Sequence, residues 1–167
     1  MTLNKSTFRQ TCLQKMRSSP KHNRLYKEKL LNKKLLELLE KSKGKKILFY
    51  YPLKIEGDIR KTLIVMRRKR EVYIPFMQGE SFKMVPFRLP LKKKKFGIFE
   101  AGNTVRKISK IDTVIVPAVG VDGNLQRVGF GKGMYDRFFE KLKKRPYIIF
   151  IQPELCFTKE LICDRYD

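Results

Sequence analysis

The sequence predicts an α/β fold: a three-layer α/β/α arrangement in which a Rossmann-like, mostly parallel sheet carries helices on both faces. Apolar runs typical of buried strands alternate with helical patterns, and this alternation occurs twice along the chain. Parallel neighbours need a crossover connection, and a helix between successive strands provides it. Because a chain of 167 residues fits one domain, we predict a single α/β domain over residues 1–167.

The first half of the chain begins its regular pattern with an amphipathic helix. Leucines recur at helical spacing over residues 25–39, and Gly44 follows where a left-handed helix cap is favourable. The apolar run ILFYYPL at 47–53 predicts a buried strand. A helical pattern at 58–70 and the β-branched and aromatic run EVYIPFM at 71–77 predict a helix and then a second strand.

The second half repeats this order. IDTVIVPAVGV at 111–121 predicts a buried strand, MYDRFFEKLKKR at 134–145 a helix and YIIFIQP at 147–153 another strand. The segment between the halves, residues 81–102, breaks the alternation. We expect a hairpin or an irregular excursion there.

The chain is strongly basic, with 39 lysines and arginines against 16 acids and a formal net charge of +23. A field of this sign attracts polyanions, which include nucleic acid, acidic lipid and multiply charged small ligands. Composition alone does not choose between these partners. Much of the excess is also typical of an ordinary solvated surface.

The cysteines and the absence of long apolar runs indicate the compartment. Cys12, Cys156 and Cys163 have no metal-ligand spacing, since the sequence contains neither C-x-x-C nor a cluster with its single histidine. A reducing, cytoplasmic setting is therefore expected. No apolar run approaches the roughly 18 residues that span a membrane. The first 27 residues contain no acid, as in a transit peptide, but they also fit a first helix of the fold.

Residues 127–136, RVGFGKGMYD, combine three glycines with basic residues and an aspartate. They follow the strand predicted to end near Val121 and precede the helix expected from Met134. In open parallel sheets, ligands bind where strands end and helices begin. Glycine amides can turn toward an anion, Arg127 can form a fork on phosphate oxygens, and Lys132 can supply a point charge.

The same residues have simpler interpretations. Asp136 can bind a magnesium ion that bridges phosphates, or it can complement the helix dipole as a first-turn acid. Lys132 can equally be a solvated charge. The segment lacks G-x-x-x-x-G-K-[ST], and its third glycine stands at 133, where the dinucleotide fingerprint needs 134. The residues alone therefore leave both a phosphate-binding loop and a plain tight turn open.

The longer segment VIVPAVGVDGNLQRVGFGKGMYD (114–136) resembles the signature of the 5-formyltetrahydrofolate cyclo-ligase family, also called methenyltetrahydrofolate synthetases. That signature has a strand ending in proline, a short loop with an aspartate, an arginine and a G-x-G-x-G-Y-Y-D run. The match extends to order and spacing. The fold that this resemblance implies is similar to the NagB/RpiA/CoA-transferase-like fold.

Residues elsewhere extend the resemblance through nearly the whole chain. Lys5 and Arg9 fit the family's N-terminal K-x-x-x-R, which contributes to its ATP site. Glu56 fits the acidic residue that contacts the pteridine of the folate. Tyr51 falls where a residue lining the substrate is expected, and Phe96 falls at a ring-stacking position.

Two departures from the family pattern stand out. Met134 replaces the first of the two tyrosines that usually precede the aspartate, so the apolar contact is kept and the hydroxyl is lost. Family members commonly continue past an acidic residue similar to Asp167 into a strand with a second aspartate near the metal. The sequence here ends at Asp167, and this second aspartate is not mapped onto it.

The resemblance implies an enzyme that converts 5-formyltetrahydrofolate and ATP, with Mg²⁺, into 5,10-methenyltetrahydrofolate, ADP and phosphate through phosphorylation of the formyl oxygen. It implies catalytic roles for Arg127, Lys132 and Tyr135, and Asp136 as the metal ligand. The implied ATP contacts are Lys5, Arg9, Arg127, Gly129, Phe130, Gly131, Lys132, Gly133, Met134 and Tyr135. The implied substrate contacts are Tyr51, Glu56, Phe96, Met134 and Tyr135. These small molecules are the expected partners of a monomer or weak dimer, with no specific nucleic acid and no membrane.

Two other classes of function stay open. A basic nucleic-acid-binding protein fits the pI of about 10.1, although the aromatic residues fall mainly inside strand-like runs and no nucleic-acid motif is found. A sugar-phosphate or acyl-CoA enzyme fits the same fold class, although it would not require Lys5 and Arg9. In a folate enzyme, the run KKKK at 92–95 is either a solvated edge or a patch that attracts the folate tail.

Overall fold

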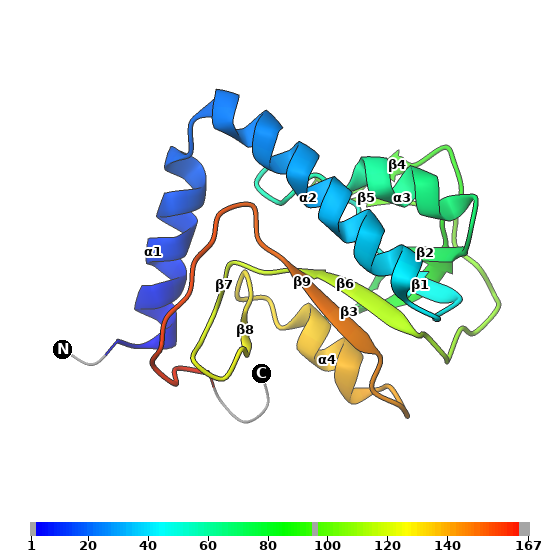
Figure 1. Cartoon of the computed structure of the whole chain (residues 1–167). Coiled ribbons are helices and arrows are strands. Elements are labelled where there is room, and N and C mark those ends of the chain that lie inside the picture. Colours follow the sequence, from blue (N-terminus) through cyan, green and yellow to red (C-terminus); the bar gives the residue numbers. More distant parts are fainter. Residues whose placement is uncertain (1–2, 95–96, 164–167) are drawn as a thin grey trace.

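The structure of the protein is a computed structural model that describes residues 3–94 and 97–163. Its centre is a five-stranded sheet in the order β3-β2-β1-β6-β9 (Figure 1). The strands are β1 (Lys46–Leu48), β2 (Glu71–Gln78), β3 (Ser81–Pro86), β6 (Thr113–Pro117) and β9 (Tyr147–Ile151). β1 runs parallel to β2 and β6, β6 runs parallel to β9, and β2 and β3 form an antiparallel pair. This mostly parallel sheet confirms the predicted fold class.

Helices cover both faces of the sheet, as predicted. α2 (Lys21–Lys41) and α3 (Arg60–Arg67) lie on one face, and α4 (Met134–Glu140) lies on the other (Figure 1). In β6, Ile115 packs in the core cluster of α2 and α3, whereas Val114 and Val116 pack in the cluster that contains Phe138 of α4. Adjacent residues of a strand point to opposite faces, so a strand covered on both faces requires a continuous apolar run.

Several elements are shorter than predicted, among them the first strand and the last helix. Of the run at 47–53, only the residues in β1 pair as a strand. The amide of Phe49 still donates to the carbonyl oxygen of Tyr73 in β2, at 2.9 Å. The chain then turns away toward the site. The helix expected at 134–145 ends at Glu140. Pro146 disfavours helical backbone in the residue before it, and the lysines before it repel one another on a helix.

The predicted cap at Gly44 is wrong. α2 ends at Ser42, whose φ is −74° and whose hydroxyl donates to the carbonyl oxygen of Leu39 at 2.8 Å. Gly44 has a different purpose: a Cβ atom there would lie 2.8 Å from the Cβ atom of Asp112. The glycine therefore allows a close approach of two chain segments.

Helix α1 (Lys5–Ser18) begins at Asn4, whose Oδ1 accepts a hydrogen bond from the amide of Thr7 at 2.8 Å. Its buried residues Phe8, Cys12 and Met16 are spaced by four and pack beside β7 (Gly120–Val121) and β8 (Arg127–Val128). One face of α1 is thereby fixed against the body of the protein, and a neighbouring face is left to border the site.

Cys12 of α1 and Cys156 form a disulfide, which the cysteine pattern did not indicate. That pattern favoured a reducing setting, where disulfides are unusual. The two cysteines are 144 positions apart in the sequence, so no local spacing could indicate the pair.

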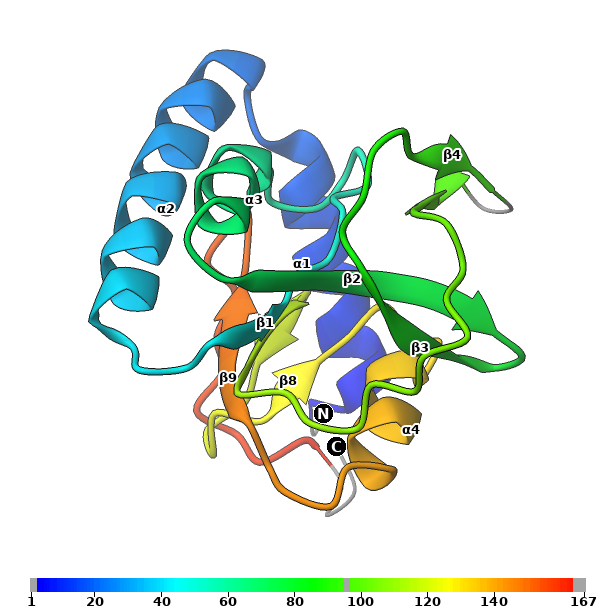
Figure 2. The ribbon, with the colours of Figure 1, turned by 90° about the vertical axis from the view of Figure 1, so that its right-hand side faces the viewer.

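The segment between the two halves forms hairpins. β3 pairs with β2, and β4 (Lys92–Lys93) pairs with β5 (Phe99–Glu100) in a separate two-stranded sheet that stands beside the end of β2 (Figure 2). Within the described ranges, no helix combines the length and apolar character needed to cross a membrane.

Candidate functional site

A cavity of about 630 Å³ opens at the carboxyl ends of β1 and β6. It is enclosed by α1, the loop after β1, β5 and the glycine loop, which we define as residues 127–133. Every described residue that the sequence analysis assigned to the site lines this cavity. They are Lys5, Arg9, Tyr51, Glu56, Arg127, Gly129, Phe130, Gly131, Lys132, Gly133, Met134, Tyr135 and Asp136. Phe96, the remaining one, lies outside the described residues.

The glycines of the loop serve two different purposes. Gly131 and Gly133 have φ values of +93° and +60°, in the left-handed region that favours glycine. Gly129 instead makes room, because a Cβ atom there would lie 2.3 Å from Nη1 of Arg127. The loop can therefore take its tight course and still pack against the arginine at its start.

Arg127 holds the loop to its neighbours. It donates from Nη1 to the carbonyl oxygen of Pro117 at 3.3 Å and from Nη2 to Oδ1 of Asp136 at 3.0 Å. Its Cζ lies 5.5 Å from the centre of the Tyr135 ring, and its side chain is only 9% exposed. Arg127 thus joins the end of β6 to the start of α4 and also contributes positive charge to the cavity wall.

Helix α1 supplies the opposite wall. Nε of Arg9 donates to the carbonyl oxygen of Gly129 at 2.8 Å, although the two residues are 120 positions apart. Lys5 lines the cavity one helical turn before Arg9. The basic pair at the N-terminus and the glycine loop therefore form one positively charged end of the cavity.

Glu56 lies in the loop after β1 and is 8% exposed. Its Oε2 accepts a hydrogen bond from the amide of Leu53 at 2.8 Å. Burial raises the pKa of this carboxyl from the ordinary 4.5 to about 7, and the hydrogen bond from Leu53 opposes the shift. Glu56 can therefore change its charge near neutral pH.

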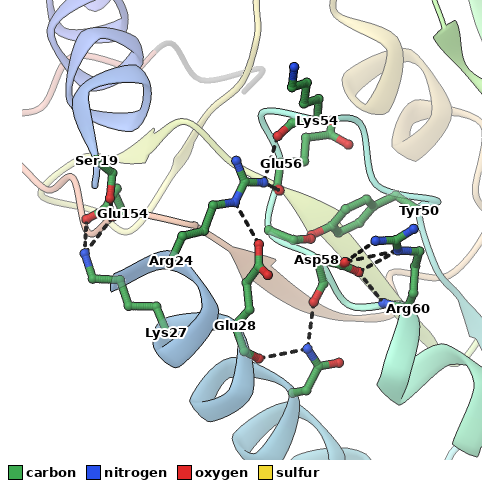
Figure 3. A network of polar contacts seen from close by, with 12 residues as sticks. Ser19, Arg24, Lys27, Glu28, Tyr50, Lys54, Glu56, Asp58, Arg60 and Glu154 are labelled. Atoms are coloured by element: carbon green, nitrogen blue, oxygen red, sulfur yellow. Dashed lines mark hydrogen bonds and ion pairs between the residues drawn. The ribbon is translucent and has the colours of Figure 1, made fainter. Parts of the chain in front are cut away.

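A polar network holds the loop that carries Glu56 (Figure 3). Nη2 of Arg24, in α2, donates to the carbonyl oxygens of Lys54 at 2.7 Å and of Glu56 at 3.2 Å, while its Nε pairs with Glu28. The hydroxyl of Tyr50 donates to the carbonyl oxygen of Gly57 at 2.6 Å. The loop is therefore fixed both by Arg24 of α2 and by the side chains of Tyr50 and Glu56 within the loop itself.

Aromatic rings make up much of the remaining wall. Tyr51, in the loop after β1, and Phe99, in β5, both line the cavity, and the centres of their rings lie 5.5 Å apart. Burial raises the pKa of Tyr135, and the negative charge of Glu56 adds to this effect while Arg127 opposes it. The Tyr135 hydroxyl therefore stays protonated at neutral pH and can donate a hydrogen bond.

A profile of the 5-formyltetrahydrofolate cyclo-ligase family matches residues 1–161. The chain belongs to this family. The match spans both halves of the sheet and every part of the cavity wall described above.

Two relatives in this family are about a quarter identical to the chain over the aligned part. A Haemophilus influenzae protein named 5-formyltetrahydrofolate cyclo-ligase is 24% identical over an alignment of 132 residues, and the match covers 72% of this chain and 70% of the relative. A Schizosaccharomyces pombe protein named as a probable 5-formyltetrahydrofolate cyclo-ligase is 26% identical over an alignment of 149 residues, and the match covers 80% of this chain and 72% of the relative.

Solved structures agree with the fold. The NMR structure of Aquifex aeolicus 5,10-methenyltetrahydrofolate synthetase superposes with a TM-score of 0.81 at 27% identity, covering 98% of this chain and 84% of that one. A 5,10-methenyltetrahydrofolate synthetase from Mycoplasma pneumoniae gives a TM-score of 0.70 at 21% identity, covering 98% and 93%. The second likeness speaks for the fold alone.

The cyclo-ligase pattern implies that Asp136 is a ligand of a magnesium ion. The side chains around Asp136 show whether the cavity suits such an ion. Among residues 3–94 and 97–163, no three histidine, cysteine or acidic side chains gather as a metal site. The single carboxylate of Asp136 fits Mg²⁺ that is held largely by nucleotide phosphates, because this ion keeps several waters and uses only one or two carboxylates. Asp167, from which the family pattern would continue, lies outside the described residues.

The structure adds cavity residues that the sequence analysis missed. They are Leu13, Arg17, Tyr50, Leu53, Ile55, Pro75, Met77, Ile98, Phe99 and Pro117. For Leu13 and Arg17 a signal existed, because they continue the four-residue spacing of Lys5 and Arg9 along one helix face. The others enter the cavity through loop and strand packing, which linear spacing does not reveal.

Proposed function

We propose that the protein is an ATP-dependent 5-formyltetrahydrofolate cyclo-ligase that forms 5,10-methenyltetrahydrofolate, ADP and phosphate, in the cytoplasm. The observation that supports this best is the composition of one cavity. It holds a buried acid, Glu56, opposite a glycine loop with Lys132 and the basic pair of α1. Family membership supports the reaction, and these groups suit its two substrates, a pteridine with N–H donors and a triphosphate.

The proposed chemistry explains why ATP is needed. Without activation, the formyl oxygen would have to leave as hydroxide, which is a poor leaving group. In the proposed route this oxygen attacks the terminal phosphorus of ATP, an O–P bond forms, and the bond to the ADP oxygen breaks. The second folate nitrogen then attacks the formyl carbon and loses its proton, and phosphate leaves with the electron pair of the C–O bond. The methenyl cation remains.

Such a route depends on alignment and charge neutralisation more than on a strong base. Lys5, Arg9 and Lys132 are suited to hold the triphosphate, together with amides of the glycine loop. Ionised Glu56 would accept hydrogen bonds from the pteridine, and the protonated Tyr135 hydroxyl would donate one to an oxygen at the reacting centre. Asp136 would hold Mg²⁺, whose charge offsets that of the phosphates when it is bound.

The test is a direct assay. Protein, MgATP and 5-formyltetrahydrofolate are mixed, and the absorbance of the conjugated methenyl product is followed. Product should form with ATP and should not form without it. No product under both conditions, together with a salt-sensitive mobility shift of RNA, would favour the nucleic-acid-binding alternative instead.

A pair of variants tests the glycine loop. Lys132 is exposed and lines the cavity, so Lys132→Ala should weaken ATP use about tenfold or more with the fold intact. Lys143→Ala removes the same charge from an exposed position that does not line the cavity, and it should keep normal turnover. Equal turnover in both variants would refute the role of the loop. Arg127 is less suitable for this test, since its buried contacts also hold the loop in shape.

A further inference from the structure

Arg17 lies at the end of the cavity away from the glycine loop and has no role in the family pattern described above. α1 turns one residue in four toward the cavity, namely Lys5, Arg9, Leu13 and Arg17. At a rise of 1.5 Å per residue, Arg17 stands about 12 Å along the helix from Arg9. The helix therefore extends positive charge well beyond the part that contacts the glycine loop.

Arg17 differs from the other two arginines of the cavity in its contacts. Arg9 donates to the carbonyl oxygen of Gly129, and Arg127 pairs with Asp136. Arg17 is exposed, and no hydrogen bond or ion pair joins it to the described part of the chain. An arginine that lines a cavity and has no protein acceptor is available for an anionic group of a ligand.

The lining between the two charged ends is apolar. Leu13 of α1 and Ile55 of the loop after β1 both line the cavity, and both pack against the core cluster under α1. Ile55 directly precedes Glu56. From Glu56 to Arg17 the wall thus changes from a hydrogen-bond acceptor to apolar side chains and then to a positive charge.

The folate substrate has the same order of groups. A pteridine with hydrogen-bond donors is followed by an apolar benzoyl ring and then by a glutamate with two carboxylates. We propose that Arg17 binds the glutamate carboxylates of the folate, and that this contact makes the enzyme favour folates that carry a glutamate tail. The proposal rests on the proposed function and extends it to the specificity of the same site.

The lysines of β4 are the other candidate for the tail. Lys92 and Lys93 are exposed, and Lys93 pairs across the hairpin with Phe99, which lines the cavity. Neither lysine lines the cavity itself, whereas Arg17 does. The geometry therefore favours Arg17.

The test compares two substrates, 5-formyltetrahydrofolate and 5-formyltetrahydropteroate, which lacks the glutamate. Arg17→Ala should raise the KM for the first about five- to tenfold, as expected for loss of one charge-assisted hydrogen bond at a solvated rim. The KM for the pteroate, the KM for ATP and kcat should change less than about twofold. Lys15→Ala is the matched control, because Lys15 lies on the same helix outside the cavity and donates to the carbonyl oxygen of Leu155.

Several results would overturn the proposal. An equal rise in KM for both folates would indicate a general structural effect, and a rise in the KM for ATP would assign Arg17 to the nucleotide. Loss of the preference for the tail in Lys92→Ala with Lys93→Ala, but not in Arg17→Ala, would assign the tail to the hairpin. A wild-type protein inactive on both folates would refute the proposed function and this inference together. An active wild type with an unaltered Arg17→Ala variant would refute the inference alone.

Discussion

Replacing Glu56 by glutamine should make the protein more stable at alkaline pH while weakening its binding of folate. The side chain is 8% exposed and accepts a hydrogen bond from the amide of Leu53. Glutamine has the same shape and can still accept that bond, but it cannot ionise. The substitution therefore removes the cost of a buried negative charge and little else.

The magnitude follows from the pKa. The folded protein holds the Glu56 proton with a pKa of about 7, against an ordinary 4.5, because burial disfavours the charged form. The contribution of Glu56 to the free energy of unfolding is therefore full below pH 4.5, falls as the pH rises from there to 7, and stays low above 7. Over about 2.5 pH units, at 1.36 kcal/mol for each, the loss is on the order of 3 kcal/mol.

Urea unfolding of wild type and Glu56→Gln at pH 5 and pH 8 measures this loss. The advantage of the variant in free energy of unfolding should be about 2.5 kcal/mol greater at pH 8 than at pH 5. Glu140→Gln is the control, since it makes the same chemical change at an exposed position. The same advantage at both pH values, or a variant less stable than wild type at pH 8, would refute the reasoning.

Folate binding provides the second half of the same prediction. If the pteridine binds the ionised form of Glu56, the competent fraction rises from about a tenth at pH 6 to about nine tenths at pH 8. The KM of the wild type for 5-formyltetrahydrofolate should fall about tenfold over this range. In Glu56→Gln it should be higher at pH 8 and should lack this dependence on pH.

Three further variants test other contacts. Arg24→Ala removes the donors to the carbonyl oxygens of Lys54 and Glu56, so it should raise the KM for folate about threefold, while Lys27→Ala on the same helix should not. Asp122→Asn should lower the free energy of unfolding by about 2–3 kcal/mol in urea titrations. The buried carboxylate accepts hydrogen bonds from four backbone amides, and the amide nitrogen of asparagine would face two of these donors. A change below about 0.5 kcal/mol would contradict this. Cys12→Ser should lower the free energy of unfolding relative to the oxidised wild type by about 5 kcal/mol, because the disulfide closes a loop of 144 residues. A difference that persists under reductant would argue against the disulfide.

The sequence predicted the strands and helices where local pattern decides them. The run at 111–121 contains β6, and EVYIPFM matches β2 almost residue for residue, because a strand buried on both faces must be apolar throughout. The prediction was wrong about where two elements end, β1 and α4. β1 stops after three residues, and α4 stops before its lysines. The residues after β1 are compatible with a longer strand, and the path of the chain beyond Leu48 is not a local property. The end of α4 has a local cause in Pro146 and the lysines before it.

The candidate site follows the same division. Lys5, Arg9, Glu56 and the glycine loop were predicted from motif order, and all of them line one cavity. Two details were not predictable from that order. Position 129 requires glycine because a side chain there would collide with Arg127, and not because the backbone is left-handed. The carboxyl of Glu56 has a pKa of about 7 because it is buried. Both depend on what surrounds a residue in space.

The sequence by itself determined the order of elements, the position of the glycine loop and the resemblance to the cyclo-ligase family, because periodicity and spacing are linear properties of the chain. Only the tertiary structure decided which distant groups meet. It joins Arg9 to Gly129 across 120 residues and Cys12 to Cys156 across 144, and it brings Arg17 to the far end of the cavity. Such contacts follow from how α1 packs beside β7 and β8, which spacing along the chain does not encode.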